Sequence, residues 1–182
     1  MPTELQIRKI DREFELFDGD RNGVIERGDY VALAHRLLDV YAVSPSSRRG
    51  RSLVTAYEAL WHRHLHDFDH DRDKRLTREE FRRAIKRRVL RENGFNEVYV
   101  PLLRAIVELV DCTERGVLNR TEFARLMAVF GVSGTDSMVT FSELDADDDE
   151  RLTVGEFVGA FRDFYFSTDP DAAANRLLGW VH

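Results

Sequence analysis

Apolar residues recur along this 182-residue chain at the three-and-four spacing of amphipathic helices, in segments separated by short acidic stretches. The first helix is predicted over residues 3–17, and the second runs from about Glu26 to Tyr41, before Pro45 breaks it. Another helical pattern begins near Ser52, and similar patterns flank the later acidic stretches. The spacing therefore predicts an all-α fold of helices joined by polar loops.

The acidic stretches are four copies of one twelve-residue pattern. Each copy opens with Asp, has a branched apolar residue at position 8, follows an apolar residue and precedes an aromatic one. A solvated acidic surface would not require apolar residues at the same positions before, within and after each acidic stretch. The pattern therefore indicates four helix–loop–helix units. The loops are residues 18–29, 69–80, 111–122 and 145–156, and their position-8 residues are Ile25, Leu76, Leu118 and Leu152.

The units are expected to pair, because an isolated unit would leave its apolar helix faces exposed. We expect the first unit to pair with the second and the third with the fourth, with the position-8 residues meeting across a short two-stranded bridge. The predicted domains are an amino-terminal pair at 1–92, a carboxyl-terminal pair at 93–166 and a tail at 167–182. Asp169 and Pro170 predict the start of a short tail helix. This helix would pack on the carboxyl-terminal lobe, which together with the other lobe forms one compact body.

Oxygen-bearing residues occupy alternate positions in three of the loops, as a hard divalent cation requires. Calcium takes six to eight oxygen ligands at about 2.3–2.6 Å, and a backbone carbonyl at position 7 is among them. Position 9 contributes directly or through water. The expected ligands are Asp18, Asp20, Asn22, Val24 (carbonyl), Glu26 and Asp29; Asp69, Asp71, Asp73, Arg75 (carbonyl), Thr77 and Glu80; and Asp145, Asp147, Asp149, Arg151 (carbonyl), Thr153 and Glu156.

Three residues in these loops depart from the ideal pattern. Asp29 stands at position 12, where Glu would reach further, and the shorter side chain favours tolerance of magnesium, which prefers six-fold coordination. Lys74 and Glu150 stand at position 6, where glycine would adopt the required left-handed backbone freely. A side chain there costs about 1–2 kcal/mol, which the carboxylates of each loop should outweigh. We therefore expect calcium in the first, second and fourth loops, with magnesium as an alternative in the first.

The third loop lacks much of this ligand set. Gly116 and Glu122 are kept, but Arg115 occupies position 5, where an oxygen is needed, and Thr113 replaces an acid at position 3. A guanidinium beside the site opposes cation binding. We expect an ion-free loop that serves as the structural partner of the fourth.

Over nearly its whole length the chain resembles the EF-hand superfamily, and more narrowly calerythrin and the sarcoplasmic calcium-binding proteins. Glu26 and Asp29, at positions 9 and 12, resemble the first loop of calerythrin, and about fifty residues separate the starts of the first two loops. Residues 162–166 and the tail resemble the same end of calerythrin. The resemblance implies that the tail fills the carboxyl-terminal hydrophobic cleft. One departure is that calerythrin-like proteins usually lose their second loop, whereas here the third is degenerate.

Composition and missing motifs argue against several other classes of protein. The net charge of −6 argues against bulk nucleic-acid binding, and no apolar run is long enough to span a membrane. The single cysteine, Cys112, excludes an internal disulfide framework, and we expect no signal peptide. No nucleophile elbow, phosphate loop or dinucleotide motif occurs, so we expect no enzyme activity. These features favour a cytoplasmic protein, and we expect a monomer.

Three other groups have two interpretations each. The histidines near the second loop are surface residues or an adventitious zinc or nickel site, and we favour the first. A basic helix is either a solvated face or a surface for a membrane or an acidic partner, and we favour the solvated face. Cys112 is either an inert thiol or a reactive one, and we favour the inert thiol. The histidines are His62, His64, His66 and His70, and the basic residues are Arg82, Arg83, Lys86, Arg87, Arg88 and Arg91.

The leading functional hypothesis is an intracellular calcium buffer or transporter. Calcium sensors use flexible, methionine-rich grooves to hold targets, and this chain has only Met1, Met127 and Met138. The alternative is a sensor that regulates one dedicated protein partner, with calcium releasing the tail or exposing the basic helix. A structural module that holds no ion is the least favoured, because acid-rich loops repel themselves without metal.

Overall fold

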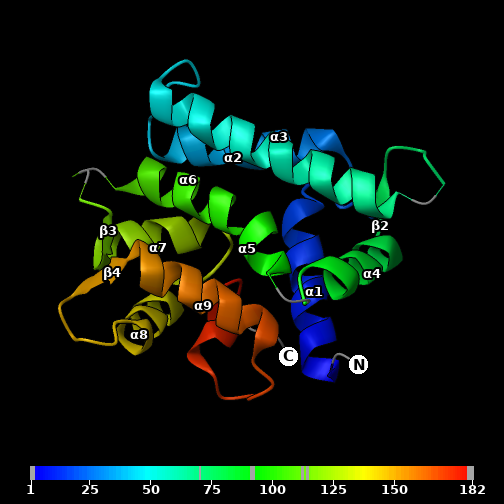
Figure 1. Cartoon of the computed structure of the whole chain (residues 1–182). Coiled ribbons are helices and arrows are strands. Elements are labelled where there is room, and N and C mark those ends of the chain that lie inside the picture. Colours follow the sequence, from blue (N-terminus) through cyan, green and yellow to red (C-terminus); the bar gives the residue numbers. More distant parts are fainter. Residues whose placement is uncertain (1–2, 70, 91–92, 112, 114, 180–182) are drawn as a thin grey trace.

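Helices form most of the part of the chain that the computed structural model describes, which is residues 3–69, 71–90, 93–111, 113 and 115–179 (Figure 1). His70, Arg91, Cys112, Trp180 and Val181 lie outside the described residues. The helices are α1 (Glu4–Phe17), α2 (Arg27–Val40), α3 (Arg48–Phe68), α4 (Arg78–Arg88), α5 (Gly94–Val98), α6 (Val100–Val110), α7 (Arg120–Val129), α8 (Gly134–Leu144), α9 (Val154–Phe166) and the 3-10 helix η1 (Ala173–Arg176). The strands are β1 (Val24–Ile25), β2 (Leu76–Thr77), β3 (Val117–Asn119) and β4 (Arg151–Thr153).

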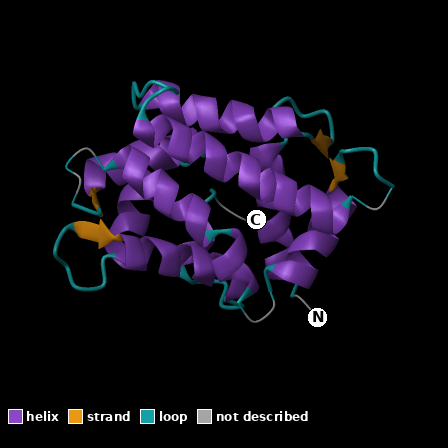
Figure 2. Ribbon diagram, turned by 45° about the horizontal axis from the view of Figure 1, so that its top comes forward, coloured by secondary structure: helices purple, strands orange, loops and turns teal. Residues whose placement is uncertain are grey.

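The loops pair as the repeat predicts. Strand β1 is antiparallel to β2, with Ile25 opposite Leu76, and β3 is antiparallel to β4, with Leu118 opposite Leu152. All four of these side chains are completely buried. Figure 2 shows the two small sheets at opposite ends of the molecule. The predicted pairing of the first unit with the second, and of the third with the fourth, is confirmed.

The third helix starts earlier than its apolar pattern suggests. We expected this helix to begin near Ser52, but α3 begins at Arg48. The Ser47 side chain caps it by accepting a hydrogen bond from the Gly50 N–H at 3.0 Å. A strong cap therefore draws the polar segment into the first turn of the helix.

The helices enclose one core that both halves of the chain share. In Figure 1, α2 and α3 lie side by side, α6 lies beneath α3, and α9 runs below α6 towards α1, in agreement with their contacts. The short helix α5, which the sequence analysis did not identify, buries Phe95 and leads to the buried Tyr99. Among the described helices, none is long and apolar enough to cross a membrane.

Within residues 167–179, the tail forms the short 3-10 helix η1, which begins at Ala173 rather than at Asp169 and Pro170. Instead of capping a helix, Asp169 accepts a hydrogen bond from the Asp171 N–H at 3.0 Å, and the Asn175 side-chain amide donates to the carbonyls of Asp169 and Pro170. These local bonds compete with helix formation. Leu177, completely buried, and Leu178, 3% exposed, nevertheless pack the tail into the core, and η1 lies against α8 and α9.

The β3–β4 bridge should contribute strongly to stability. We predict that Leu152→Ala lowers the free energy of unfolding by about 2–5 kcal/mol, because it leaves a cavity at a fully buried position. Urea unfolding measures this loss. Val139→Ala is the control, because Val139 is 47% exposed and should change stability by less than about 0.5 kcal/mol. An equal effect of the two substitutions would contradict the role of the bridge.

Candidate metal centres

The aspartate that opens each loop binds the backbone of its own loop. Asp18 accepts hydrogen bonds from the N–H groups of Asn22 and Gly23, both at 3.0 Å. In the second and fourth loops the same two positions donate to Asp69 and Asp145 at 3.0–3.2 Å. Next, the position-5 side chain accepts from the N–H of position 7. The acceptors are Asn22 (2.9 Å), Asp73 (2.8 Å) and Asp149 (2.9 Å). The three loops thus share one hydrogen-bonded frame.

This frame brings carboxylates together. Oxygen atoms of the carboxylates at positions 1, 3 and 5 lie within 4.8 Å of one another in the second and fourth loops. In the fourth loop, desolvation and the charges of Asp149, Glu156 and Asp145 raise the pKa of Asp147. In the first loop, burial, together with the charges of neighbouring acids, raises the pKa of Asp29. A divalent cation would relieve this repulsion, and the oxygen donors fit calcium.

The predicted left-handed turn occurs at position 6 of every loop. Gly23 and Gly116 have φ values of 87° and 73°, and the non-glycine residues Lys74 and Glu150 have values of 64° and 62°. Position 4 is a second left-handed position that was not predicted from the sequence: Arg21, Arg72 and Asp148 have φ values of 56–62° there. Residue type gave little signal there, because Arg is not favoured in this conformation.

Positions 9 and 12 also begin the exiting helices. In the second loop, the Thr77 N–H donates to a Glu80 carboxylate oxygen at 2.9 Å, and the Glu80 N–H donates back to the Thr77 hydroxyl at 3.3 Å. Thr153 and Glu156 repeat this capping box. The expected ligands at these positions are therefore held beside the loop, with each Thr hydroxyl already hydrogen-bonded to the carboxylate at position 12.

An ion pair links the first two loops. The Arg75 guanidinium lies 2.7 Å from the Glu26 carboxylate. Glu26 is an expected calcium ligand through its side chain, and Arg75 is one through its carbonyl. The ion pair directs the Glu26 carboxylate towards the neighbouring loop. The cross-loop contact depends on the antiparallel bridge, and no sequence motif predicted it.

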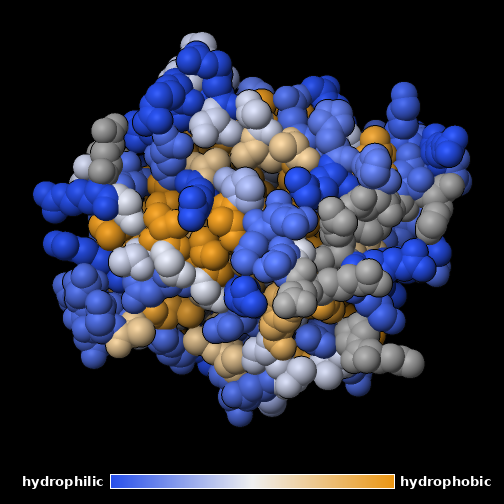
Figure 3. All heavy atoms as spheres, viewed as in Figure 1, coloured by the Kyte–Doolittle hydropathy of each residue, from blue (hydrophilic) through white to orange (hydrophobic). Residues whose placement is uncertain are grey.

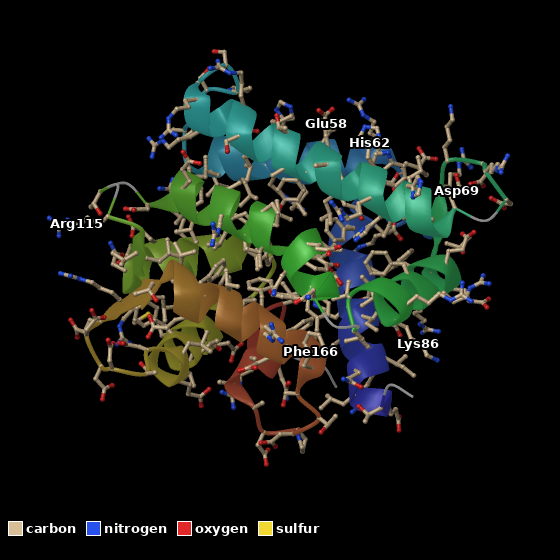
Figure 4. All side chains as sticks on the ribbon, in the orientation of Figure 1. Glu58, His62, Asp69, Lys86, Arg115 and Phe166 are labelled. Carbon is tan, nitrogen blue, oxygen red and sulfur yellow. The ribbon has the colours of Figure 1, made fainter. Side chains whose placement is uncertain are left out.

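The third loop keeps its turn but lacks the oxygen ligands of the other three loops at positions 3 and 5. Asp111 accepts from the Gly116 N–H at 2.6 Å, but its other oxygen accepts from the N–H and hydroxyl of Thr113, both at 2.8 Å. Although burial acts to raise it, these hydrogen bonds hold the pKa of Asp111 below its usual value. Figure 4 shows Arg115, at position 5, pointing away from the body of the protein. One oxygen of Asp111 is therefore bonded to Thr113, and position 5 carries no oxygen side chain.

Part of the basic helix contacts α1, and the histidines near the second loop are partly exposed and partly buried. Arg82 of α4 binds both carboxylate oxygens of Asp11 at 2.5 Å, so part of the basic face joins α1. His62 and His66 are exposed, as expected, and Figure 4 shows His62 on the outer face of α3. The expectation was wrong for His64, which is 1% exposed and has Nδ1 2.6 Å from the Tyr30 hydroxyl.

The strained position-6 residue of the second loop provides a test. We predict that Lys74→Gly increases calcium affinity several-fold, because it removes about 1 kcal/mol of left-handed strain and a nearby positive charge. Calorimetric titration measures the change. Lys74→Met removes the charge but keeps the strain, and should recover only part of the gain. An affinity that Lys74→Gly leaves unchanged would show that the strain does not limit binding.

Comparison with known proteins agrees with this geometry. The model of the EF-hand domain pair matches residues 58–128, which span the second and third units. Calerythrin of Saccharopolyspora erythraea is 25% identical over 168 residues, which cover 91% of this chain and 95% of calerythrin. The sarcoplasmic calcium-binding protein of amphioxus is 16% identical, with a TM-score of 0.77 over 98% of each chain, and shares the fold.

A calcium-binding protein of Streptomyces coelicolor is 33% identical. Its structure superposes with a TM-score of 0.76 and covers 88% of this chain and 97% of its own. That structure was described as a basis for prokaryotic calcium-mediated regulation. Together with the four helix–loop–helix units and their paired loops, this likeness establishes that the chain belongs to the EF-hand family of calcium-binding proteins, in which it is a homologue of calerythrin.

Proposed function

We propose that the protein holds about three calcium ions, one in each of the first, second and fourth loops, through the ligands predicted from the sequence. The observation that carries this proposal is that each of these loops carries oxygen side chains at positions 1, 3 and 5 on one hydrogen-bonded frame. Thr77 and Thr153 would act through water, because their hydroxyls cap helices. The first loop would also accept magnesium, since Asp29 is short for bidentate contact.

The third loop would hold no ion and would support the fourth through the β3–β4 bridge. Its positions 3 and 5 carry Thr113 and Arg115 in place of acids, and the Thr113 N–H and hydroxyl both donate to one oxygen of Asp111. We further propose that residues 1–92 and 93–166 form the two EF-hand pairs and 167–182 the tail, with strand pairing inside each half as support. A cytoplasmic monomer remains part of this proposal.

We propose that the protein buffers or transports calcium. Sensors expose a flexible, methionine-rich groove when they bind calcium, whereas here Met127 is completely buried in the core. The tail occupies apolar surface with Leu177 and Leu178, and an ion pair between Arg176 and Glu143 of α8 holds it there. A protein closed in this way takes up ions without presenting a large new surface.

A sensor with a dedicated partner is the second candidate. The 33% identical relative was described in terms of calcium-mediated regulation. Figure 3 shows an apolar area on one face, over α6 and towards α9, surrounded by hydrophilic side chains. Apolar areas bordered by polar residues are typical of protein–protein contact sites. In this case calcium would have to enlarge the area or release the tail.

The number of sites can be measured directly. Calorimetric titration of the wild type should give about three calcium ions. Asp145→Ala should remove one, because it deletes the residue that organises the fourth loop. Asp111→Ala changes the same position of the third loop and should leave the number at about three. Loss of a site in Asp111→Ala would instead assign an ion to the third loop. Millimolar magnesium should compete most at the first loop.

Removal of residues 169–182 separates buffer from sensor. In a buffer, the deletion should lower the free energy of unfolding by roughly 3–6 kcal/mol, because two buried leucines are lost, and apolar dye binding should not depend on calcium. In a sensor, the truncated chain should bind the dye only with calcium. Asp171→Asn, a change at an exposed tail residue, is the control and should resemble the wild type.

A further inference from the structure

Helix α1 meets the carboxyl-terminal half of the chain through polar side chains. The Gln6 amide donates to the Tyr165 carbonyl at 3.0 Å, the Lys9 amine to the Ser167 carbonyl at 3.0 Å, and the Arg12 guanidinium to the Phe130 carbonyl at 3.3 Å. Figure 4 shows Phe166, at the end of α9, close to α1. This contact between the two halves is directional as well as apolar.

Glu13 lies at the centre of this contact. Its side chain is buried, with 3% of the residue exposed. One carboxyl oxygen, Oε1, accepts hydrogen bonds from the hydroxyls of Tyr99 (2.7 Å) and Tyr165 (2.6 Å). Tyr99 joins α5 to α6 and Tyr165 belongs to α9, so a single oxygen of α1 holds two elements of the other half.

The second oxygen of Glu13, Oε2, has no hydrogen-bond partner among the described residues. Glu13 also borders a cavity of about 30 Å³ whose lining is almost entirely apolar and includes Leu16, Leu103 and Phe161. A neutral carboxyl can place its proton on Oε2, whereas an ionised one would leave a bare charged oxygen in apolar surroundings, at a high cost.

Within the described part of the chain, the groups that face Glu13 offer no compensating cation. Tyr30 of α2 and Tyr57 of α3 lie near it, and His64 of α3 bonds to Tyr30 and packs on Tyr99. Lys9, one turn earlier on α1, is directed to the Ser167 carbonyl, and burial lowers its pKa to about 8.

The arginines of α4 and α1 near this contact bind other groups. Arg78 and Arg82 of α4 contact Asp11, and Arg12 bonds to backbone carbonyls. Burial raises the pKa of Glu13 to about 7, although its bonds from Tyr165 and Tyr99 oppose the shift.

We propose that Glu13 is a proton-controlled latch between α1 and the carboxyl-terminal half. The neutral carboxyl holds both tyrosines and closes the contact, and its ionisation loosens the contact. An acid whose pKa is raised on folding stabilises the fold fully below its unfolded value, which is about 4.5, and this stabilisation is lost as the pH rises through about 7. The latch therefore closes in acid and loosens in mild alkali, whichever role calcium binding serves.

The test uses the full chain with saturating calcium. We expect the carbon-13 resonance of the Glu13 carboxyl, assigned by its absence in Glu13→Gln, to titrate near pH 7. Between pH 5 and pH 8, the folding equilibrium constant of Glu13→Gln should rise relative to that of the wild type by on the order of a hundredfold. Glu4→Gln, an exposed change on the same helix, should show no such trend.

The latch also requires a change in the contact itself. Amide hydrogen exchange in α5 and at the end of α9 should accelerate, after correction for intrinsic rates, as Glu13 ionises. A carboxyl that titrates near 4.5, a pH-independent difference between Glu13→Gln and wild type, or unchanged exchange through the titration would each overturn the proposal. If Glu13→Gln does not fold, Tyr165→Phe replaces it and should raise the titration midpoint of Glu13, because it removes a hydrogen bond that favours the charged form.

Discussion

The hydrogen bonds from backbone N–H groups to the first aspartate of each loop are the restraint on which the rest of the structure depends. Carboxylates that lie within 4.8 Å of one another repel, and the donors at positions 5 and 6 hold the first of them in place. The same aspartate ends the entering helix, as when the Asp18 N–H donates to the Phe14 carbonyl at 2.8 Å. Loop geometry and helix direction are thus coupled at one residue.

Features that depend on local chemistry and spacing could be predicted from the sequence. Ile25 and Leu76 occupy the same position of the twelve-residue loop pattern. They lie opposite each other, because a two-stranded bridge leaves little freedom of register. The left-handed conformation of Lys74 follows from the turn that every loop requires, whatever residue is present. The degenerate character of the third loop was visible from Thr113 and Arg115, and the altered bonding of Asp111 is its structural counterpart.

Features that depend on contacts between distant segments could not be predicted in this way. His64 has the sequence context of a surface histidine, but its burial against Tyr30 depends on how α2 packs on α3. The Glu26–Arg75 pair and the contacts of Glu13 join residues 49 to 152 positions apart, and no local pattern specifies them. The tail was predicted to be helical because Asp169 and Pro170 suit a helix start, but Asn175 gives its backbone other partners.

The polar contact of α1 bears on the choice between buffer and sensor. Apolar surfaces can slide past one another at modest cost, whereas Gln6, Lys9 and Glu13 each have a directional partner in the other half. Moving α1 would leave the buried side chains of Lys9 and Glu13 without their partners, at about 1–3 kcal/mol each. Because α1 leads directly into the first loop, this contact also fixes the orientation of that loop before any ion arrives. A pre-oriented loop and a resistant contact suit a protein that takes up calcium without opening, and a sensor built on this frame would need its opening to begin elsewhere, at the tail or at α4.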